Sequence, residues 1–197
     1  LVGSEMCIRD RVGEIFLKFN PFAQKDITTW LIDRGIEVVP PLMTDFFMQS
    51  FVNMKVNQDS HIKKKYIPDF AIDWLYGKVQ KQIDKINKIG KAFLYFQPFE
   101  NIYEKAEKAK QVISLNTQFG EGWLIAGEMS SFASQGINHV ISLQPFGCIA
   151  NHIVEKGIEK RIKSVYPQIN ILSLDFDSSV SDVNIINRLL LFVDNIK

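Results

Sequence analysis

One cysteine, with a histidine four positions after it, is the part of this sequence best suited to chemistry. Both lie in LQPFGCIANHI, residues 143–153, where an apolar run gives way to a helical pattern. The position predicts that Cys148 lies in the first turn of a helix, where unpaired backbone N–H groups and the helix dipole favour a thiolate. His152 is expected on the same helical face and could approach the sulfur. Cys148 could therefore be a packed small hydrophobe, a nucleophile, or one ligand of a metal cluster.

The residue pattern by itself favours the structural role for Cys148, since free cysteines are often buried. No oxyanion-hole motif accompanies the Cys-His pair, which makes a nucleophile the less favoured interpretation. Metal ligation cannot be completed within the chain, because the sequence contains no C-x-x-C and no H-x-x-x-H. The stretch GEGW, residues 120–123, lacks the spacing of a dinucleotide or P-loop motif and is a weak phosphate signal.

Strands and helices that alternate along the chain must position Cys148. Four short runs rich in strand formers predict an α/β fold: a small open parallel sheet of about four strands, with helices on both faces. The first two strands and the helix between them should form a βαβ unit with a right-handed crossover. The predicted strands are 13–19, 36–42, 139–145 and 169–177, and the predicted helices around them are 26–35, 120–136, 149–167 and 180–197.

The carboxyl ends of these strands define the expected binding edge, because ligands of open parallel sheets bind there. Three carboxylates, Glu121, Glu128 and Asp175, are expected near this rim, and we interpret them as solvated surface residues rather than catalytic groups. The rim should comprise residues 20–22, 144–148 and 175–179.

A helical insertion is predicted at about residues 43–117, where the only weak strand signal is FLYF at 93–96. Aromatic and methionine side chains recur at helical spacing over residues 46–54, and such a stripe is typical of core packing rather than of a cofactor site. The basic run HIKKKY, residues 61–66, is interpreted as an exposed loop or helix start rather than a phosphate site.

Composition excludes several classes of function. Lysine and arginine together number 23 against 22 aspartates and glutamates. Such a balance gives no overall field that would attract nucleic acid or an anionic membrane. No run approaches the roughly 18 apolar residues that a membrane span requires, so neither nucleic acid nor membrane is expected as a partner. Two cysteines do not make a disulfide framework, which indicates a cytoplasmic protein.

The opening LVGSEMCIRDR has no amphipathic period and no cap leading into the first strand. It closely resembles adapter-derived peptide found at the ends of proteins translated from environmental sequencing data. We therefore expect residues 1–11 to be an artefactual tail, Cys7 to have no function, and the natural protein to begin well upstream of Val12. Residues 12–197 are then expected to form a single α/β domain with its helical insertion.

Four runs of the chain resemble, in order, the carboxyl-terminal part of acyl-CoA dehydratase activase-related proteins. These are relatives of 2-hydroxyacyl-CoA dehydratase subunits and are often fused to ATP-dependent activase domains. The resemblance spans nearly everything from Gly13 to Arg188, and it is most specific in QPFGC-x-x-NH and in the D-x-D-x-S-x-S-x-x-N segment from Asp175 to Asn184. The four runs are GEIFLKFNPF, QFGEGWLIAGEM, LQPFGCIANHIVEKGIEKRIKSVYP and INILSLDFDSSVSDVNIINR.

The resemblance implies that Cys148 is one ligand of an iron–sulfur cluster of the 4Fe-4S kind, shared between separate α/β domains. Gly147 and the following helix N–H groups would hydrogen-bond the cluster sulfurs, with Asn151 and His152 in the surrounding shell. The implied activity is low-potential electron transfer or radical-type reduction of an acyl-CoA in anaerobic metabolism. The upstream cysteine-bearing segment and the ATPase domains are missing here. The alternative is a non-catalytic interaction or regulatory domain that keeps the fold without a cluster.

Overall fold

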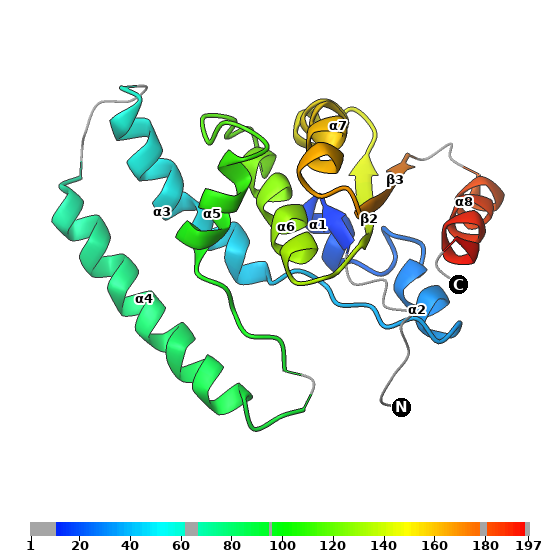
Figure 1. The fold of residues 1–197 in the computed structure, drawn as a ribbon, viewed down its shortest axis with the longest axis horizontal. Coiled ribbons are helices and arrows are strands. Elements are labelled where there is room, and N and C mark those ends of the chain that lie inside the picture. The colour runs from blue at the N-terminus through cyan, green and yellow to red at the C-terminus, as the bar shows by residue number, and fades with distance from the viewer. Residues whose placement is uncertain (1–10, 62–66, 95, 178–180, 196–197) are drawn as a thin grey trace.

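The computed structural model describes residues 11–61, 67–94, 96–177 and 181–195. Within these ranges a three-stranded parallel sheet in the order β1-β2-β3 lies among helices (Figure 1). The strands are β1 (Arg11–Gly13), β2 (His139–Pro145) and β3 (Asn170–Phe176). The helices are α1 (Ile15–Phe19), α2 (Ile27–Ile32), α3 (Met43–Asp59), α4 (Asp69–Gly90), α5 (Ile102–Lys110), α6 (Gly122–Ser134), the π-helix η1 (Ile149–Glu155), α7 (Lys156–Val165) and α8 (Asp182–Asp194).

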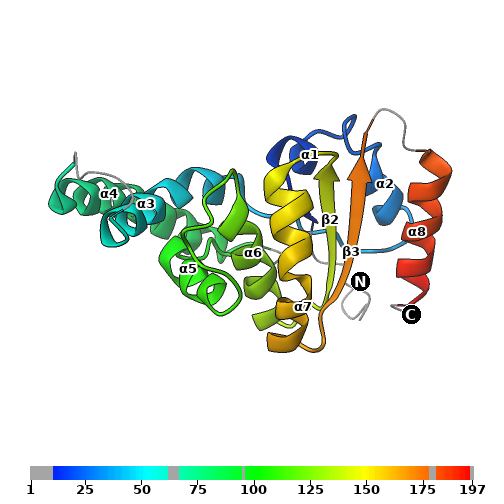
Figure 2. The same ribbon diagram turned by 90° about the horizontal axis from the view of Figure 1, so that it is seen from above.

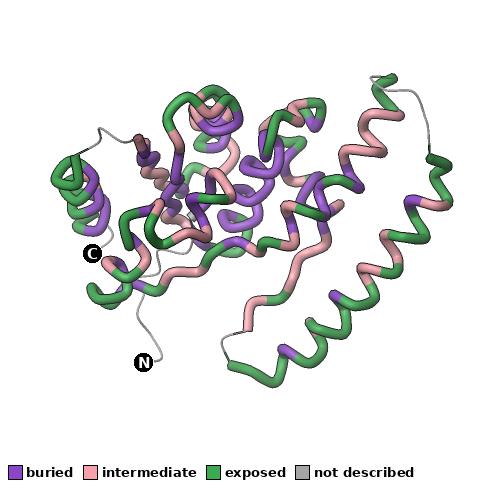
Figure 3. The backbone as a smooth tube through the Cα atoms, turned by 180° about the vertical axis from the view of Figure 1, so that it is seen from behind, coloured by how far each residue is buried: buried purple, intermediate pink, exposed green. Residues whose placement is uncertain are grey.

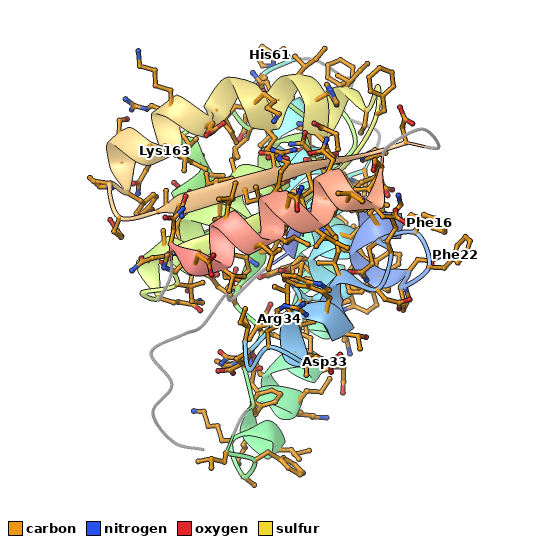
Figure 4. All side chains as sticks on the ribbon, turned by 90° about the vertical axis from the view of Figure 1, so that its right-hand side faces the viewer. Phe16, Phe22, Asp33, Arg34, His61 and Lys163 are labelled. Atoms are coloured by element: carbon orange, nitrogen blue, oxygen red, sulfur yellow. The ribbon has the colours of Figure 1, made fainter. Side chains whose placement is uncertain are left out.

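The predicted α/β fold with a small open parallel sheet and helices on both faces is confirmed. Successive side chains of β2 point to opposite faces of the sheet, so the strand contributes to two hydrophobic cores. Val140 packs with α6 and α7, whereas Ile141 and Leu143 pack with α2 and α8. Figure 2 shows α7 on one face of β2 and β3 and α8 on the other, and Figure 4 shows β3 between these two helices. Both faces of the central strand are therefore buried, as a parallel sheet requires.

The predicted strand at 13–19 is wrong for most of its length. β1 ends at Gly13, and residues 15–19 form helix α1 instead. The Glu14 carboxylate accepts a hydrogen bond from the Leu17 N–H at 3.0 Å, which caps the first turn of that helix. A short apolar run fits a strand or a helix equally well by periodicity, and here the cap decides for the helix. Arg11, which we assigned to the tail, belongs to β1, whereas residues 1–10 lie outside the described residues.

The predicted strand at 36–42 is also wrong, since it contains only an isolated bridge at Glu37. Pro40 and Pro41 have no N–H group to donate to a strand ladder, so the segment continues as irregular chain. The expected βαβ unit of the first two strands is absent as a result. β1 instead pairs in parallel with β2, with Arg11 opposite Ile141 and Gly13 opposite Leu143.

The helical insertion agrees with the prediction, because 43–117 contains α3, α4 and α5. In Figure 1 these helices lie to one side of the sheet, and α8 lies on the opposite side. The expected core stripe is confirmed for Met48 and Phe51, which are buried, whereas Phe47 is exposed. The indole N–H of Trp123 in α6 donates to Asn53 Oδ1 of α3 at 2.7 Å, which ties the insertion to the sheet-covering layer. FLYF forms no strand in its described residues, and residues 62–66 of HIKKKY lie outside the described residues.

Candidate functional site at the carboxyl edge of the sheet

A tight turn after β2 presents Cys148 at the edge of the sheet. The Cys148 N–H donates to the Pro145 carbonyl at 3.2 Å, and Phe146 donates to the carbonyl of Phe176 at the end of β3. Gly147 closes the turn with a φ of +79°, a conformation that favours glycine. Cys148 follows in an extended conformation and is the residue that precedes η1. The prediction that Cys148 lies between a strand and a helix is confirmed, but the residue precedes the helix and does not lie in its first turn.

The Cys148 side chain is neither fully buried nor free in solvent. Its sulfur lies 3.2 Å from Asn151 Oδ1, a hydrogen bond in which the thiol donates. Asn151 is buried, and its amide N–H also reaches the Leu143 carbonyl at 3.4 Å. The buried Asn151 therefore fixes the sulfur at the surface of the core cluster, where an incoming group can reach it.

His152 does not pair with the sulfur. Its Nδ1 lies 3.8 Å from Asp175 Oδ1, and its ring meets the Phe146 ring edge to face at 5.6 Å. The i, i+4 prediction assumed α-helical geometry, but residues 149–155 form a π-helix, whose wider turn changes which side chains are neighbours. Asn151, at i+3, occupies the position beside the thiol. The contact between His152 and Asp175 brings η1 close to the carboxyl end of β3.

Glu121 and Glu128 are buried, so their interpretation as solvated surface carboxylates was wrong. Both pair with Lys18 of α1: Nζ lies 2.8 Å from Glu121 Oε1 and 3.3 Å from Glu128 Oε1. Glu121 also accepts the Ile15 N–H at 2.9 Å, one of the free donors at the start of α1. The three side chains fasten α1, which follows β1, to α6. Asp175, in contrast, is partly exposed, and residues 178 and 179 of its predicted rim lie outside the described residues.

A second buried ion pair, Lys105 with Asp45, lies close enough to affect Glu128. Burial raises the pKa of Glu128 to about 7, against the opposing effect of the two lysines. Burial also raises the pKa of Glu121, although Lys18 opposes the shift. For Lys18, burial alone would lower the pKa, but the two glutamates outweigh it and the net shift is upward. Three carboxylates thus share two ammonium groups inside the protein, a cluster able to hold a proton near neutral pH.

Glu155, at the end of η1, forms another buried polar group on the same face of the sheet. Its carboxylate accepts hydrogen bonds from Ser142 of β2 and from Ser173 of β3, the latter at 3.0 Å. Burial raises the pKa of Glu155, although these hydrogen bonds oppose the shift. The bonds join the end of η1 to neighbouring residues of β2 and β3. They therefore hold the π-helix in position.

The sequence analysis missed Lys18, Glu155, Ser142 and Ser173. For the two serines, the signal was present in the strand alternation: in HVISLQP and in INILSLDFD, serine occupies positions that face the same core as Val140 and Ile171. A polar residue in a core-facing register needs a partner, which is the evidence that could have revealed them. Lys18 gave no such signal, because residues 13–19 were predicted as a strand and Lys18 lies in helix α1.

The predicted metal ligand Cys148 has no set of further ligands around it in the described part of the chain. Across the described ranges, no three histidine, cysteine, aspartate or glutamate side chains come together in an arrangement that could hold a metal ion. Cys148 is the one cysteine among the described residues. A cluster that used its sulfur would need its remaining ligands from another chain or domain.

A separate cavity of about 140 Å³ lies on the other face of the sheet, between α2 and α8. Its lining is mainly apolar and includes Trp30 and Leu189, and the ion pair of Lys25 with Asp182 also lines it. Figure 4 shows Phe16 and Phe22 projecting from the neighbouring N-terminal segment. None of the predicted site residues lines this cavity.

Among the described residues, no helix combines the length and the apolar character needed to cross a membrane. Comparisons with protein-family models, with curated proteins and with solved structures find no match to this chain.

Proposed function

We propose that this chain contributes Cys148 as one ligand of an iron–sulfur cluster in a larger dehydratase-like or activase-related protein. The observation that carries the proposal is the position of the thiol. The thiol is half-buried and lies after the central strand, on the residue that precedes η1. A cysteine shared between domains must present its sulfur in this way, because the other ligands approach from outside.

The surroundings of Cys148 support an interdomain position. Phe146, Ile149 and Ile153 flank it and are 71%, 54% and 66% exposed. Large apolar side chains gathered on a surface indicate a contact with another protein part. A second domain placed there would cover them and exclude water from the cluster, which tunes its potential.

The residues around the sulfur fit a thiolate ligand. Asn151 offers an amide at hydrogen-bond distance, and rotation of that amide would replace the accepting oxygen by a donating N–H, at the cost of the long bond to Leu143. Gly147 leaves open space beside the turn, since a Cβ there would meet no atom within 4 Å. His152 and Asp175 would belong to the outer shell. Glu121 and Glu128 support α1 and α6 and need not touch the cluster.

In this proposal the cluster would supply low-potential one-electron chemistry, with electrons delivered by ATP-dependent activase domains and an acyl-CoA as the acceptor. A cytoplasmic location belongs to the same proposal, because a reducing compartment keeps the thiol free. The second candidate is an interaction domain without a cluster. The exposed apolar side chains around Cys148 and the single ligand also agree with an interaction domain. The metal content of the protein distinguishes these two candidate functions.

The test uses the full-length natural protein, reconstituted anaerobically with iron and sulfide. Cys148→Ala and Cys148→Ser should both fold but lose most of the cluster absorbance and the bound iron, because serine oxygen is a much harder ligand than thiolate. His152→Ala should keep the iron and shift the reduction potential. Normal iron and sulfide content with an unaltered spectrum in both cysteine variants would sink the ligand assignment and support the interaction domain.

A further inference from the structure

Helix α4 is an arm that is packed along one side only. Its described residues Ile72, Ile83 and Gly90 are buried, and most of the remaining surface is exposed (Figure 3). Asn87 exchanges two hydrogen bonds with the Phe99 backbone, at 2.8 and 3.0 Å, and Tyr76 donates to Asn101 at 3.0 Å. These contacts fix the helix in place against the body of the protein and leave its outward side uncovered.

An apolar seam runs along the uncovered side of α4. Leu75, Ile86 and Ile89 are 48%, 47% and 68% exposed, and Phe93, in the turn after the helix, is 69% exposed. Together with the exposed Gln82 and with Val79, which is half-buried against the core, they recur at alternating spacings of three and four residues, the spacing of a helix-packing seam. From Leu75 to Ile89 the seam is about 21 Å long, at 1.5 Å per residue.

Lysines border this seam on its outward side. Lys78 and Lys85 lie next to it at i+3 and i+4 spacings from its members, and Lys81 and Lys88 form the next row. All four are exposed. The acidic residues of α4 lie elsewhere on the helix, where Asp73 pairs with Lys55 at 2.7 Å and Asp84 accepts from Gln80 at 2.9 Å. The seam therefore has the protein body on one side and a row of positive charge on the other.

We propose that this seam, defined as residues 75, 79, 82, 86, 89 and 93, docks an amphipathic helix of a partner protein that carries acidic residues along one flank. Such a helix would cover the apolar seam and neutralise the lysine row at once. A second copy of this chain does not fit, because its own lysines would face Lys78 and Lys85. Nucleic acid would satisfy the lysines and leave the seam exposed. A bilayer surface is the competing ligand that the test must separate, because Phe70 and Trp74 of α4 are also exposed, at 75% and 64%.

The test measures binding of the full chain to a designed helical peptide with leucines in its seam positions and glutamates on its flanks. We expect binding that weakens with added salt and that falls about tenfold or more in Lys78→Glu/Lys85→Glu and in Ile86→Ser/Ile89→Ser. Lys156→Glu/Lys160→Glu on α7 and Val183→Ser/Leu191→Ser on α8 are the matched controls and should bind normally. All of these residues are exposed, and unchanged circular dichroism would confirm that each variant folds.

A charge-reversal experiment tests the pairing of the lysine row with the acidic flank more directly. The Lys78→Glu/Lys85→Glu variant should bind a peptide whose flanking glutamates are replaced by lysines, and the unaltered protein should reject that peptide. Absence of binding to the acidic peptide, or equal binding of both peptides, would overturn the proposal. Binding instead to anionic phospholipid vesicles or to a single-stranded oligonucleotide, with the same dependence on Lys78 and Lys85, would assign the surface to that ligand and overturn the helix.

Discussion

At the scale of single residues, Glu128 is a buried carboxyl group whose ionised form is only partly stabilised by its surroundings. Lys18 and Lys105 approach it from α1 and α5, and Glu121 and Asp45 place two further carboxylates near it. Burial penalises its ionised form more than the lysines stabilise it, so its pKa rises from 4.5 to about 7. The protein therefore holds a proton on Glu128 under conditions where an unfolded chain has released it.

This retained proton predicts how stability depends on pH. Between pH 4.5 and pH 7 the unfolded state loses the proton of Glu128 first, so the contribution of this group is fully present below pH 4.5 and is lost as pH rises through 7. Glu128→Gln mimics the protonated form and removes the contribution of this group to the pH dependence of stability. Relative to the unaltered protein, this variant should gain about 2 kcal/mol of unfolding free energy between pH 5 and pH 7.5, measured in urea.

Glu107→Gln is the control for that experiment, because Glu107 is exposed on α5 and pairs with the exposed Lys110. Its unfolding free energy should follow that of the unaltered protein at both pH values. An identical pH slope in the Glu128→Gln variant would show that Glu128 does not hold a proton in the folded protein.

At the scale of elements, β1 is a strand of three residues that fits closely against β2. The backbone of Gly13 adopts a φ of +117°, and a Cβ at this position would stand 2.1 Å from the Leu143 carbonyl oxygen. Glu14 then donates its N–H to the same carbonyl at 3.2 Å, which directs the chain into α1. Glycine at this position lets the strand end and the helix begin within two residues.

The strand position of Gly13 predicts a large effect of Gly13→Ala. The added methyl group would overlap backbone rather than a flexible side chain, so we expect a loss of about 3 kcal/mol or more in unfolding free energy. Gly35→Ala is the matched control: its φ is +77°, but a Cβ there meets no atom within 4 Å, and it should cost about 1 kcal/mol. Equal unfolding midpoints for the two variants would contradict the pairing of β1 with β2.

At the scale of the whole molecule, the insertion and the sheet share one hydrophobic core. Met48 of α3, Ile83 of α4, Ala106 of α5 and Val140 of β2 belong to the same buried cluster. The contribution of the helices to this cluster is unequal. Residues 122–133 of α6 are all buried, whereas α4 contributes three buried residues over its 22-residue length.

The unequal burial of α4 and α6 predicts which of the two helices unfolds locally first. Local opening of α4 exposes little apolar surface, so its amides should exchange with solvent much faster than those of α6, by at least about a hundredfold near Ile83 relative to Ile125. Exchange at α6 should instead require global unfolding. Native-state hydrogen exchange measures both. Equal protection of α4 and α6 would mean that the arm opens only together with the core.

The sequence by itself determined the helices and strands that can be predicted from residues close to one another in the chain. The apolar run HVISLQP and the helical pattern after it were sufficient to predict β2 and to place Cys148 between strand and helix. The helical insertion and the final helix α8 were predicted for the same reason, since spacing of apolar residues and turn residues act within a few positions. These predictions depend on chain neighbours, which the sequence contains.

Tertiary structure decided everything that depends on residues distant in the chain. The pairing of β1 with β2 joins Gly13 to Leu143, and no local pattern identifies that partner. The burial of Glu121 and Glu128 depends on Lys18, more than 100 positions earlier, whose ammonium group offsets part of the cost of burying two carboxylates. The π-helical turn likewise gave Cys148 the partner Asn151 and gave His152 the partner Asp175. Charge burial and hydrogen-bond satisfaction are properties of the packed chain, so the sequence could name these residues but could not assign their partners.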